Sequence, residues 1–360
     1  MVAPAPPPDA ARCVVLLWIG RLGDLLIATP AMAAVRRRYP GARIVLVTGE
    51  RGEGAGRLSP DVDEVLVLRR FHRPLSNLAL VRALVREEAD VLVDLNSSFS
   101  RGAWTLAALA RARWKLGFLK GRGDRVFSRT LSAPGVEEHM LDRYARLARE
   151  LDAPFEPRLR IRLTEEDRRR AREVLRSLLP SALSGRGRRP PSKDGGPSAA
   201  AAQRSLVGVF PGNFKKFDNR WPEEKFAELT GRLDPGRLDL LYVAGPGEEK
   251  DVRGIVARLA RPVPVVPPLP LGVLAALLGE LDLLVTNATG TAHLAVAAGT
   301  PTFSILSRYT RTVWMPEGRL CDGVPHSSVV SASWDSCRDI SVDEVFAKLT
   351  ETLGKLGSRS

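Results

Sequence analysis

The sequence predicts an α/β protein with two doubly wound domains, and three observations indicate this. Short apolar runs of strand length alternate with amphipathic segments of helix length, as in parallel sheets that are covered by helices on both faces. The alternation stops in one stretch rich in Pro, Gly and Ser, and then begins again. With 360 residues, the chain is long enough to bury two separate hydrophobic cores.

In the first half, strands are predicted from continuous apolar runs such as CVVLLWI and RIVLVTG. The segments between them have apolar residues at helical spacing, and the first ends at Pro40 and Gly41, which stop helices. The predicted strands are residues 13–19, 43–49, 64–68 and 91–95, and the predicted helices are residues 25–40 and 74–88.

The second half repeats the pattern. The segment WPEEKFAELTGRL has proline at its first turn and glutamates directly behind it, which is typical of a helix start. The predicted strands are residues 205–212, 238–247, 283–287 and 301–306, and the predicted helices are residues 221–233, 248–260, 271–281 and 289–299.

The domain boundaries are predicted from composition. The stretch PSALSGRGRRPPSKDGGPSAAAAQR has no periodicity and cannot bury apolar area, so it is interpreted as a flexible linker or disordered loop. A basic segment that binds anionic surfaces is the alternative. The predicted parts are a disordered tail (1–11), an N-terminal domain (12–179), the linker (180–204), a C-terminal domain (205–340) and a C-terminal helix (341–360).

Composition narrows the class of protein. Hydrophobic residues make up 44% and charged residues 26% of the chain, as in soluble globular enzymes. The N-terminus lacks the apolar core of a secretory signal, and no apolar run approaches the roughly 18 residues that a membrane span needs. We therefore expect a cytoplasmic protein. Its three cysteines have no CxxC spacing and predict neither a disulfide framework nor a zinc site, with Cys13 as a small core residue.

The formal net charge of +13 fits nucleic acid, anionic lipid or phosphorylated substrates. No helix-turn-helix, zinc finger or aromatic-studded basic sheet motif accompanies it, which argues against nucleic acid. The charge by itself does not choose between the remaining partners.

Four strand-to-helix junctions carry the candidate site residues, because ligands of open α/β sheets bind beyond the carboxyl ends of the strands. In the first junction, WIGRLGDLLIATP, Gly20 and Gly23 permit a sharp turn and Asp24 falls at the start of a helix. A carboxylate in that place is either a helix cap or a general base. The pattern alone favours the cap.

The second junction is VFPGNFKKFDNRWPEE. Cations before a helix start, together with free backbone N–H groups, are typical of a phosphate site. An exposed basic loop is the alternative. The candidate residues are Gly212, Asn213, Lys215, Lys216 and Arg220.

The third and fourth junctions are VAGPGEE and TNATGTAHLAVAAG. Gly245 and Gly247 permit close backbone approach, but the turn is not GxGxxG, which disfavours a dinucleotide site. In the fourth junction, hydroxyls and amides at a helix start are placed to hold phosphate; a capping threonine and a packed histidine are the alternative. The candidates there are Thr289, Gly290, Thr291 and His293.

With these segments the sequence resembles the heptosyltransferase-type glycosyltransferases of family 9, which act in lipopolysaccharide core assembly. The resemblance rests on IGRLGDLLIATPAMAAVRRRYPGARIVLVTG, VGVFPG with RWPEEKFAEL, VAGPGEE, and the TG-x-x-H-x-A motif within TNATGTAHLAVAAGTPTFSIL. It implies a GT-B fold, in which two Rossmann-like doubly wound domains face each other across a cleft. The first domain binds the acceptor and the second the nucleotide sugar.

The resemblance also implies roles for the candidate residues. Asp24 is the general base of an inverting, metal-independent transfer that needs no cofactor, with Gly20, Arg21 and Gly23 on the acceptor side. The lysines and the amides at the fourth junction stabilise the leaving diphosphate, and His293 supports that site. ADP-heptose is the implied donor and a lipopolysaccharide core or related glycan the acceptor. The basic surface is compatible with peripheral contact with the anionic inner membrane.

The sequence departs from the family pattern at two places. Relatives usually carry an acidic residue directly before the TG, where this chain has Ala288, and a lysine shortly before the RWP, where it has Asn219. These differences favour an alternative in which the protein is a retired enzyme that binds or scaffolds without transfer. A nucleotide-sugar epimerase of the same fold is a third reading, but it predicts more acidic residues in the cleft.

Overall fold

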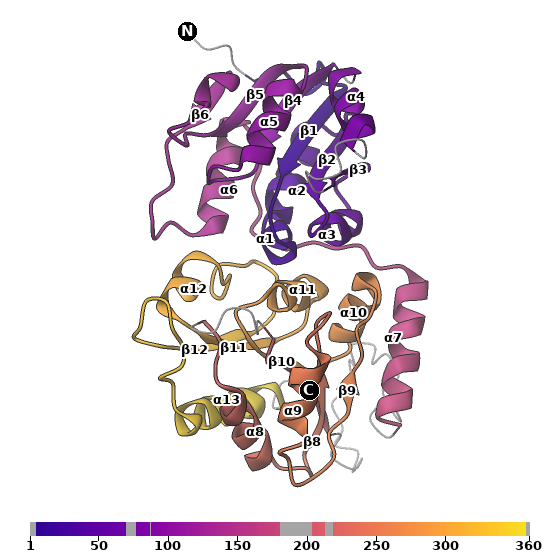
Figure 1. Ribbon diagram of the computed structural model, residues 1–360, viewed down its shortest axis with the longest axis vertical. Coiled ribbons are helices and arrows are strands. Elements are labelled where there is room, and N and C mark those ends of the chain that lie inside the picture. The colour runs from indigo at the N-terminus through magenta and orange to yellow at the C-terminus, as the bar shows by residue number, and fades with distance from the viewer. Residues whose placement is uncertain (1–4, 70–76, 87, 181–203, 213–218, 358–360) are drawn as a thin grey trace, which may run out of the picture. The chain divides into compact units, whose positions relative to one another are not determined.

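The computed structural model describes residues 5–69, 77–86, 88–180, 204–212 and 219–357. The chain divides into two compact units, each with one sheet that is flanked by helices (Figure 1). Unit 1 comprises residues 1–162 and 312–322, and unit 2 comprises residues 163–311 and 323–360. Among the described residues, no helix combines the length and the apolar character that crossing a membrane requires.

Unit 1 contains a six-stranded parallel sheet of order β3-β2-β1-β4-β5-β6. Its core is formed by apolar side chains of the central strands, including Val15, Leu17 and Leu92, packed against the helices. The elements are β1 (Cys13–Trp18), α1 (Leu22–Ile27), α2 (Thr29–Arg38), β2 (Arg43–Gly49), α3 (Glu53–Leu58), β3 (Glu64–Leu68), α4 (Leu78–Arg86), β4 (Ala89–Asp94), α5 (Arg101–Leu109), β5 (Ala112–Phe118), the 3₁₀ helix η2 (Asp124–Val126), β6 (Arg129–Leu131) and α6 (Met140–Glu150).

Unit 2 contains a second six-stranded parallel sheet, of order β9-β8-β7-β10-β11-β12. The elements are α7 (Glu165–Leu178), β7 (Ser205–Phe210), α8 (Glu223–Arg232), β8 (Leu238–Val243), α9 (Glu249–Val256), β9 (Val265–Val266), α10 (Leu271–Leu278), β10 (Leu283–Asn287), α11 (Gly290–Ala298), β11 (Thr302–Leu306), β12 (His326–Val330) and α13 (Val342–Gly357). The short helix α12 (Arg308–Val313) lies where the chain passes from unit 2 back to unit 1.

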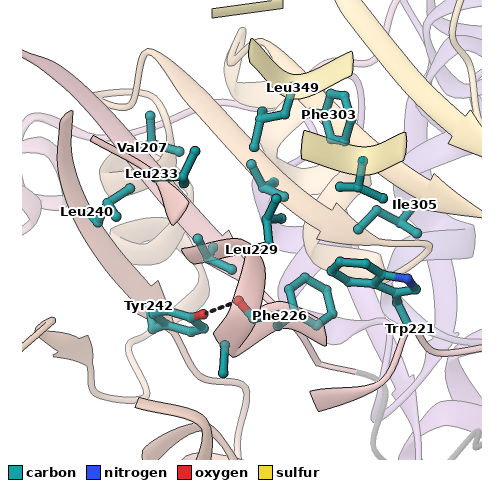
Figure 2. Packing of buried hydrophobic residues seen from close by; sticks show 14 of the residues in the cluster. Val207, Trp221, Phe226, Leu229, Leu233, Leu240, Tyr242, Phe303, Ile305 and Leu349 are labelled. Atoms are coloured by element: carbon teal, nitrogen blue, oxygen red, sulfur yellow. Dashed lines mark hydrogen bonds between the residues drawn. The ribbon is translucent and has the colours of Figure 1, made fainter. Parts of the chain in front are cut away.

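The core of unit 2 is anchored by aromatic side chains (Figure 2). Trp221 and Phe226 meet edge to face, with ring centroids 5.0 Å apart, a geometry that contributes about 0.5–1.5 kcal/mol beyond the buried area. The hydroxyl of Tyr242 donates to the carbonyl of Phe226 at 3.3 Å, as the dashed line in Figure 2 shows. This packing fixes the start of α8.

Both sheets have the strand order 3-2-1-4-5-6 of the doubly wound fold, counted within each unit. Strand order therefore reverses between β1 and β4 in unit 1 and between β7 and β10 in unit 2. Ligands of such sheets bind at the carboxyl ends of these two strands. The topology thus marks one candidate site in each unit.

The predicted strands and helices are present, with boundaries moved by a few residues. One prediction was wrong: the single helix expected at 25–40 is two helices, α1 and α2, joined at Ala28. The break has a physical cause, because Pro30 in the first turn of α2 has no N–H to continue the hydrogen bonds of a preceding helix.

The units also divide differently from the predicted domains. Helix α7 belongs to unit 2 rather than to a domain spanning 12–179, and Arg172 of α7 pairs with Glu280 at 2.9 Å. The tail predicted for 1–11 is partly ordered: Ala11 is buried, and the hydroxyl of Tyr39 donates to the carbonyl of Pro6. Of the predicted linker, residues 181–203 lie outside the described residues.

The cysteines occupy three different environments. Cys13 is half-buried at the start of β1, Cys321 is exposed, and Cys337 is buried in the core of unit 2. Burial raises the pKa of the Cys337 thiol to about 12, so this side chain behaves as a small apolar residue.

Candidate functional site

The site in unit 1 begins at the turn between β1 and α1. A Cβ at Gly20 would lie 2.8 Å from the indole of Trp18, so only glycine fits there. Arg21 is the N-cap residue of α1 and makes no side-chain cap, while Gly23 is buried in the helix. Asp24 lies in the first turn of α1, three residues beyond the N-cap. It is therefore not the cap that the sequence pattern favoured, although its charge still complements the helix dipole.

A second carboxylate occupies the carboxyl end of β4. Asp94 is fully buried, and its Oδ2 is 2.5 Å from Nζ of Lys120, whose side chain is also buried. The other oxygen, Oδ1, accepts hydrogen bonds from the backbone N–H of Asn96 at 2.9 Å and from its Nδ2 at 2.7 Å. Asp94 is thus a paired and fully hydrogen-bonded anion, as burial of a charge requires.

A third buried polar side chain of unit 1 is that of Tyr144, on α6. Its side chain is fully buried, and no group in the described part of the chain hydrogen-bonds to its hydroxyl. Burial, followed by the negative charges of Asp24 and Asp94, raises the pKa of this phenol well above its usual value. The phenol of Tyr144 therefore stays protonated in the field of the carboxylates that follow β1 and end β4.

Asn96 holds the carboxyl end of β1 beside that of β4. Its side chain is buried; Oδ1 accepts from the N–H of Ile19 at 3.2 Å and Nδ2 donates to the carbonyl of Leu17 at 3.4 Å. The turn that carries Asp24 is thereby fixed to the neighbouring strand.

Asn287 has the equivalent place in unit 2, at the end of β10. Its buried Oδ1 accepts from the N–H of Trp221 at 3.1 Å, and Nδ2 donates to the carbonyl of Pro211 at 3.0 Å. It therefore joins the end of β7 to the start of α8. Each point where strand order reverses is held by one buried asparagine.

Glu248 covers the carboxyl ends of β7 and β8. Its Oε2 is so close that a Cβ at Gly212 would lie 2.7 Å from it, and a Cβ at Gly245 would lie 2.5 Å away. The sequence predicted close approach at Gly245, where the carboxylate of Glu248 is the nearest group; at Gly212 the ring of Phe210 is nearer, with carbons 2.5 Å from the Cβ position. The sequence did not single out Glu248 itself. Its signal was an acidic residue directly behind the second strand of the doubly wound order, where ribose hydroxyls bind.

At the start of α11, the side chain of the N-cap residue accepts one backbone hydrogen bond, and other backbone N–H groups have no acceptor within the helix. Thr289 is the N-cap, and its hydroxyl accepts from the N–H of Ala292 at 3.3 Å, so the capping alternative is correct for this side chain. Gly290 and Thr291 are the first residues of the helix, and amides in these positions have no acceptor within the helix. His293 is buried one turn in.

Of the remaining candidate residues, one is buried and three lie outside the part of the chain that the structure describes. Arg220 is buried and pairs with Glu223 at 3.0 Å. Asn213, Lys215 and Lys216 lie outside the described residues. Ala288, half-buried directly after β10, stands where relatives were expected to carry an acid.

Two Rossmann-like sheets of this order in one chain are the architecture of the GT-B fold, and solved glycosyltransferases share it. The chain has this fold. The family model of glycosyltransferase family 9 (heptosyltransferase) matches residues 77–321 of this chain. The chain therefore belongs to glycosyltransferase family 9.

Individual relatives are distant in sequence and similar in fold. The lipopolysaccharide core heptosyltransferase OpsX of Haemophilus influenzae is 19% identical over 82% of this chain and 79% of its own length. A crystal structure of a family 9 glycosyltransferase from Veillonella parvula is 19% identical with a TM-score of 0.79, covering 99% of both chains. ADP-heptose lipopolysaccharide heptosyltransferase II of E. coli is 16% identical with a TM-score of 0.70, covering 96% of this chain and 99% of its own.

Proposed function

We propose that the chain transfers heptose from ADP-heptose to a lipopolysaccharide core or related glycan, with inversion and without a metal. The observation that carries the proposal is the place of Asp24 in the first turn of α1, at the strand reversal of unit 1. The family match supports the reaction class, and the relatives named for ADP-heptose and lipopolysaccharide support the substrates.

In the proposed reaction, the carboxylate of Asp24 takes the proton of the acceptor hydroxyl. The hydroxyl oxygen attacks the anomeric carbon from the face opposite the nucleotide, and the bond between that carbon and the diphosphate oxygen breaks. The nucleoside diphosphate leaves with the bonding electron pair. One carboxylate suffices, because no covalent enzyme intermediate forms.

The donor binds, in this proposal, at the strand reversal of unit 2. The free amides of Gly290 and Thr291 and the positive end of α11 meet the diphosphate. Lys215 and Lys216 add the charge that stabilises the leaving group. Asn287 joins the end of β7 to the start of α8 beside this proposed donor site.

Glu248 is proposed to bind the ribose of the donor, because it is the N-cap residue of α9 after β8, the second strand of the doubly wound order, and its carboxylate approaches Gly245 just beyond that strand. Glu248→Gln is expected to raise the Kd for ADP about tenfold or more, as for loss of a hydrogen bond to a charged group. Isothermal titration calorimetry measures this. Glu249→Gln makes the same charge change one residue away and should leave the Kd within about twofold. Equal losses in both variants would assign the effect to charge alone.

A panel of nucleoside diphosphates and nucleotide sugars tests the donor class without knowledge of the acceptor. ADP and ADP-heptose are expected to raise the melting temperature, since a ligand that binds only the folded state stabilises it. A larger response to uridine or guanosine diphosphate would reject the donor, and no response to any of them would reject the site in unit 2. Release of ADP in the presence of a lipopolysaccharide core acceptor tests the transfer itself.

The proposal includes the cellular place of the reaction. A lipid-linked acceptor at the inner face of the cytoplasmic membrane requires a cytoplasmic enzyme that contacts this surface peripherally. The formal net charge of +13 supports such contact, because the cytoplasmic leaflet is anionic.

The alternative of a retired binding protein is favoured by Ala288, which follows β10 without the expected acid. Under our proposal, Ala288→Asp changes the turnover of ADP-heptose by less than about tenfold, since the proton is taken elsewhere. ADP release by wild type and variant is compared with the same acceptor. Activity that arises only in the variant would establish the retired form.

A further inference from the structure

Unit 1 exposes large apolar side chains where β4 and β5 end. Phe99 is 42% exposed, Trp104 36% and Leu119 43%. Phe99 lies in the loop between β4 and α5, Trp104 in the first turns of α5, and Leu119 directly after β5. Exposed apolar residues are common singly, whereas aromatic and aliphatic side chains gathered at one edge mark an interaction surface.

The start of α5 and the loop after β5 are in direct contact. The indole Nε1 of Trp104 donates to the carbonyl of Gly123 at 3.2 Å, and Gly123 has a φ of +67°. A Cβ at Gly123 would lie 1.9 Å from that nitrogen, so the ring rests directly on the loop after β5. The loop is itself closed by a hydrogen bond from the N–H of Lys120 to Asp124 at 2.9 Å. Trp104 is therefore held in place with about a third of its surface exposed.

The same segment carries a concentrated positive charge. Residues 95–130 contain eight basic residues and one acidic residue. Three of the basic residues are paired with carboxylates outside this range: Arg113 with Asp90, Lys120 with Asp94 and Arg129 with Glu150. Arg101, Arg122 and Arg125 are exposed, and none has an ion-pair partner in the described part of the chain. Surface arginines without carboxylate partners remain available to an external anion.

We propose that this surface docks on an anionic lipid bilayer. We name it the α5 face and define it as Phe99, Arg101, Trp104, Leu119, Arg122 and Arg125. Rings of tryptophan and phenylalanine lie at the level of lipid headgroups, and arginines beside them bind lipid phosphates. The inference rests on the proposed function, which supplies a lipid-linked acceptor.

The position of the α5 face within unit 1 agrees with this partner. Phe99 and Arg101 follow the end of β4, where Asp94 and Asn96 adjoin the turn of Asp24. Lys120, which pairs with Asp94, belongs to the same loop as Arg122. A bilayer that contacts this edge brings the sugar of a lipid-linked acceptor to the edge that holds the proposed base.

Vesicle sedimentation tests the proposal on the full chain. The wild type is expected to bind vesicles that contain about 30% phosphatidylglycerol at least tenfold more tightly than phosphatidylcholine vesicles, with weaker binding at high salt. Phe99→Ser, Trp104→Ser and the triple variant Arg101→Gln/Arg122→Gln/Arg125→Gln should each lose binding, the triple variant by roughly tenfold or more. Phe99→Ser does not disturb the contact of Trp104 with Gly123, so its result does not depend on the fold of that loop.

The matched control is Arg176→Gln/Arg253→Gln/Arg258→Gln, which removes the same charge from exposed positions of unit 2. It should retain binding to within about threefold, because only net charge changes. No binding of the wild type to anionic vesicles, or equal losses in both triple variants, would overturn the proposal. Full binding by both serine variants would overturn it as well.

ADP affinity, measured on the same samples, separates this inference from the proposed function. Loss of vesicle binding with unchanged ADP binding in the α5-face variants is the expected combination. A wild type that binds and turns over ADP-heptose without binding vesicles would reject the α5 face alone. A wild type that binds vesicles but no nucleotide would reject the donor assignment alone.

Discussion

Asp24→Asn is expected to lower the rate of sugar transfer by about 10²- to 10⁴-fold, the usual contribution of a general base. Asparagine has nearly the same shape as aspartate and still accepts hydrogen bonds, but it cannot take a proton from the acceptor hydroxyl. Because Asp24 belongs to unit 1 and the proposed nucleotide site to unit 2, the Kd for ADP should remain within about twofold. ADP release and calorimetry measure the two quantities separately.

The control for this variant is Asp142→Asn. Asp142 lies in the first turn of α6, as Asp24 lies in the first turn of α1, and it is exposed and paired with Arg319 at 2.8 Å. Each replacement removes a favourable interaction with a helix dipole, which contributes about 0.3–1 kcal/mol. If Asp24 acts only on its helix, the two variants will have similar small losses of stability and nearly normal turnover.

Most of the strands predicted from the sequence are buried on both faces, where an unbroken apolar run is required. The exception is β3, an apolar end strand whose side chains are only half-buried or exposed. Three of the strands that were missed have mixed composition: β5 reads ARWKLGF, and β6 and β12 read RTL and HSSVV. The fourth, β9, is apolar but only two residues long. β6 and β12 are end strands of their sheets, so one edge lacks a neighbour and polar side chains are tolerated. Such strands are recognised by their hydrogen-bonded neighbours in the sheet, which the sequence pattern does not reveal.

The residues of the candidate site could also be predicted only in part from the sequence. Local signals, such as glycines at strand ends and an acid in a first helical turn, were readable in the chain, and the structure finds Gly20, Gly212 and Gly245 in tight places. Asp94 was not singled out, because it ends an apolar run and its partner Lys120 is 26 residues away. Asn96 and Asn287 bridge strands that are distant in sequence. Such contacts depend on sheet register, which no local pattern encodes.

Lys120→Met is expected to destabilise unit 1 by about 3–5 kcal/mol, the typical cost of leaving one partner of a buried ion pair without the other. The methionine fills a similar volume, but Asp94 retains only its hydrogen bonds from Asn96 in a fully buried place. Urea unfolding, followed by hydrogen exchange of the β1 and β4 amides, measures the loss in unit 1 itself. Asp94, Asn96 and the turn of Asp24 are linked by hydrogen bonds. The rate of sugar transfer should therefore fall even at urea concentrations that leave the protein folded.

Two further variants show whether burial is the cause. Lys348→Met removes an exposed partner of Glu351 and should cost no more than about 1 kcal/mol. The double variant Asp94→Leu/Lys120→Met removes both charges and should recover much of the stability lost in Lys120→Met, since well-packed apolar side chains replace buried pairs without loss. Its activity should remain low, because Asn96 loses the carboxylate that orients its amide. If Lys120→Met costs no more than Lys348→Met, water reaches the pair in solution, and Asp94 does not stabilise the turn that carries the proposed base.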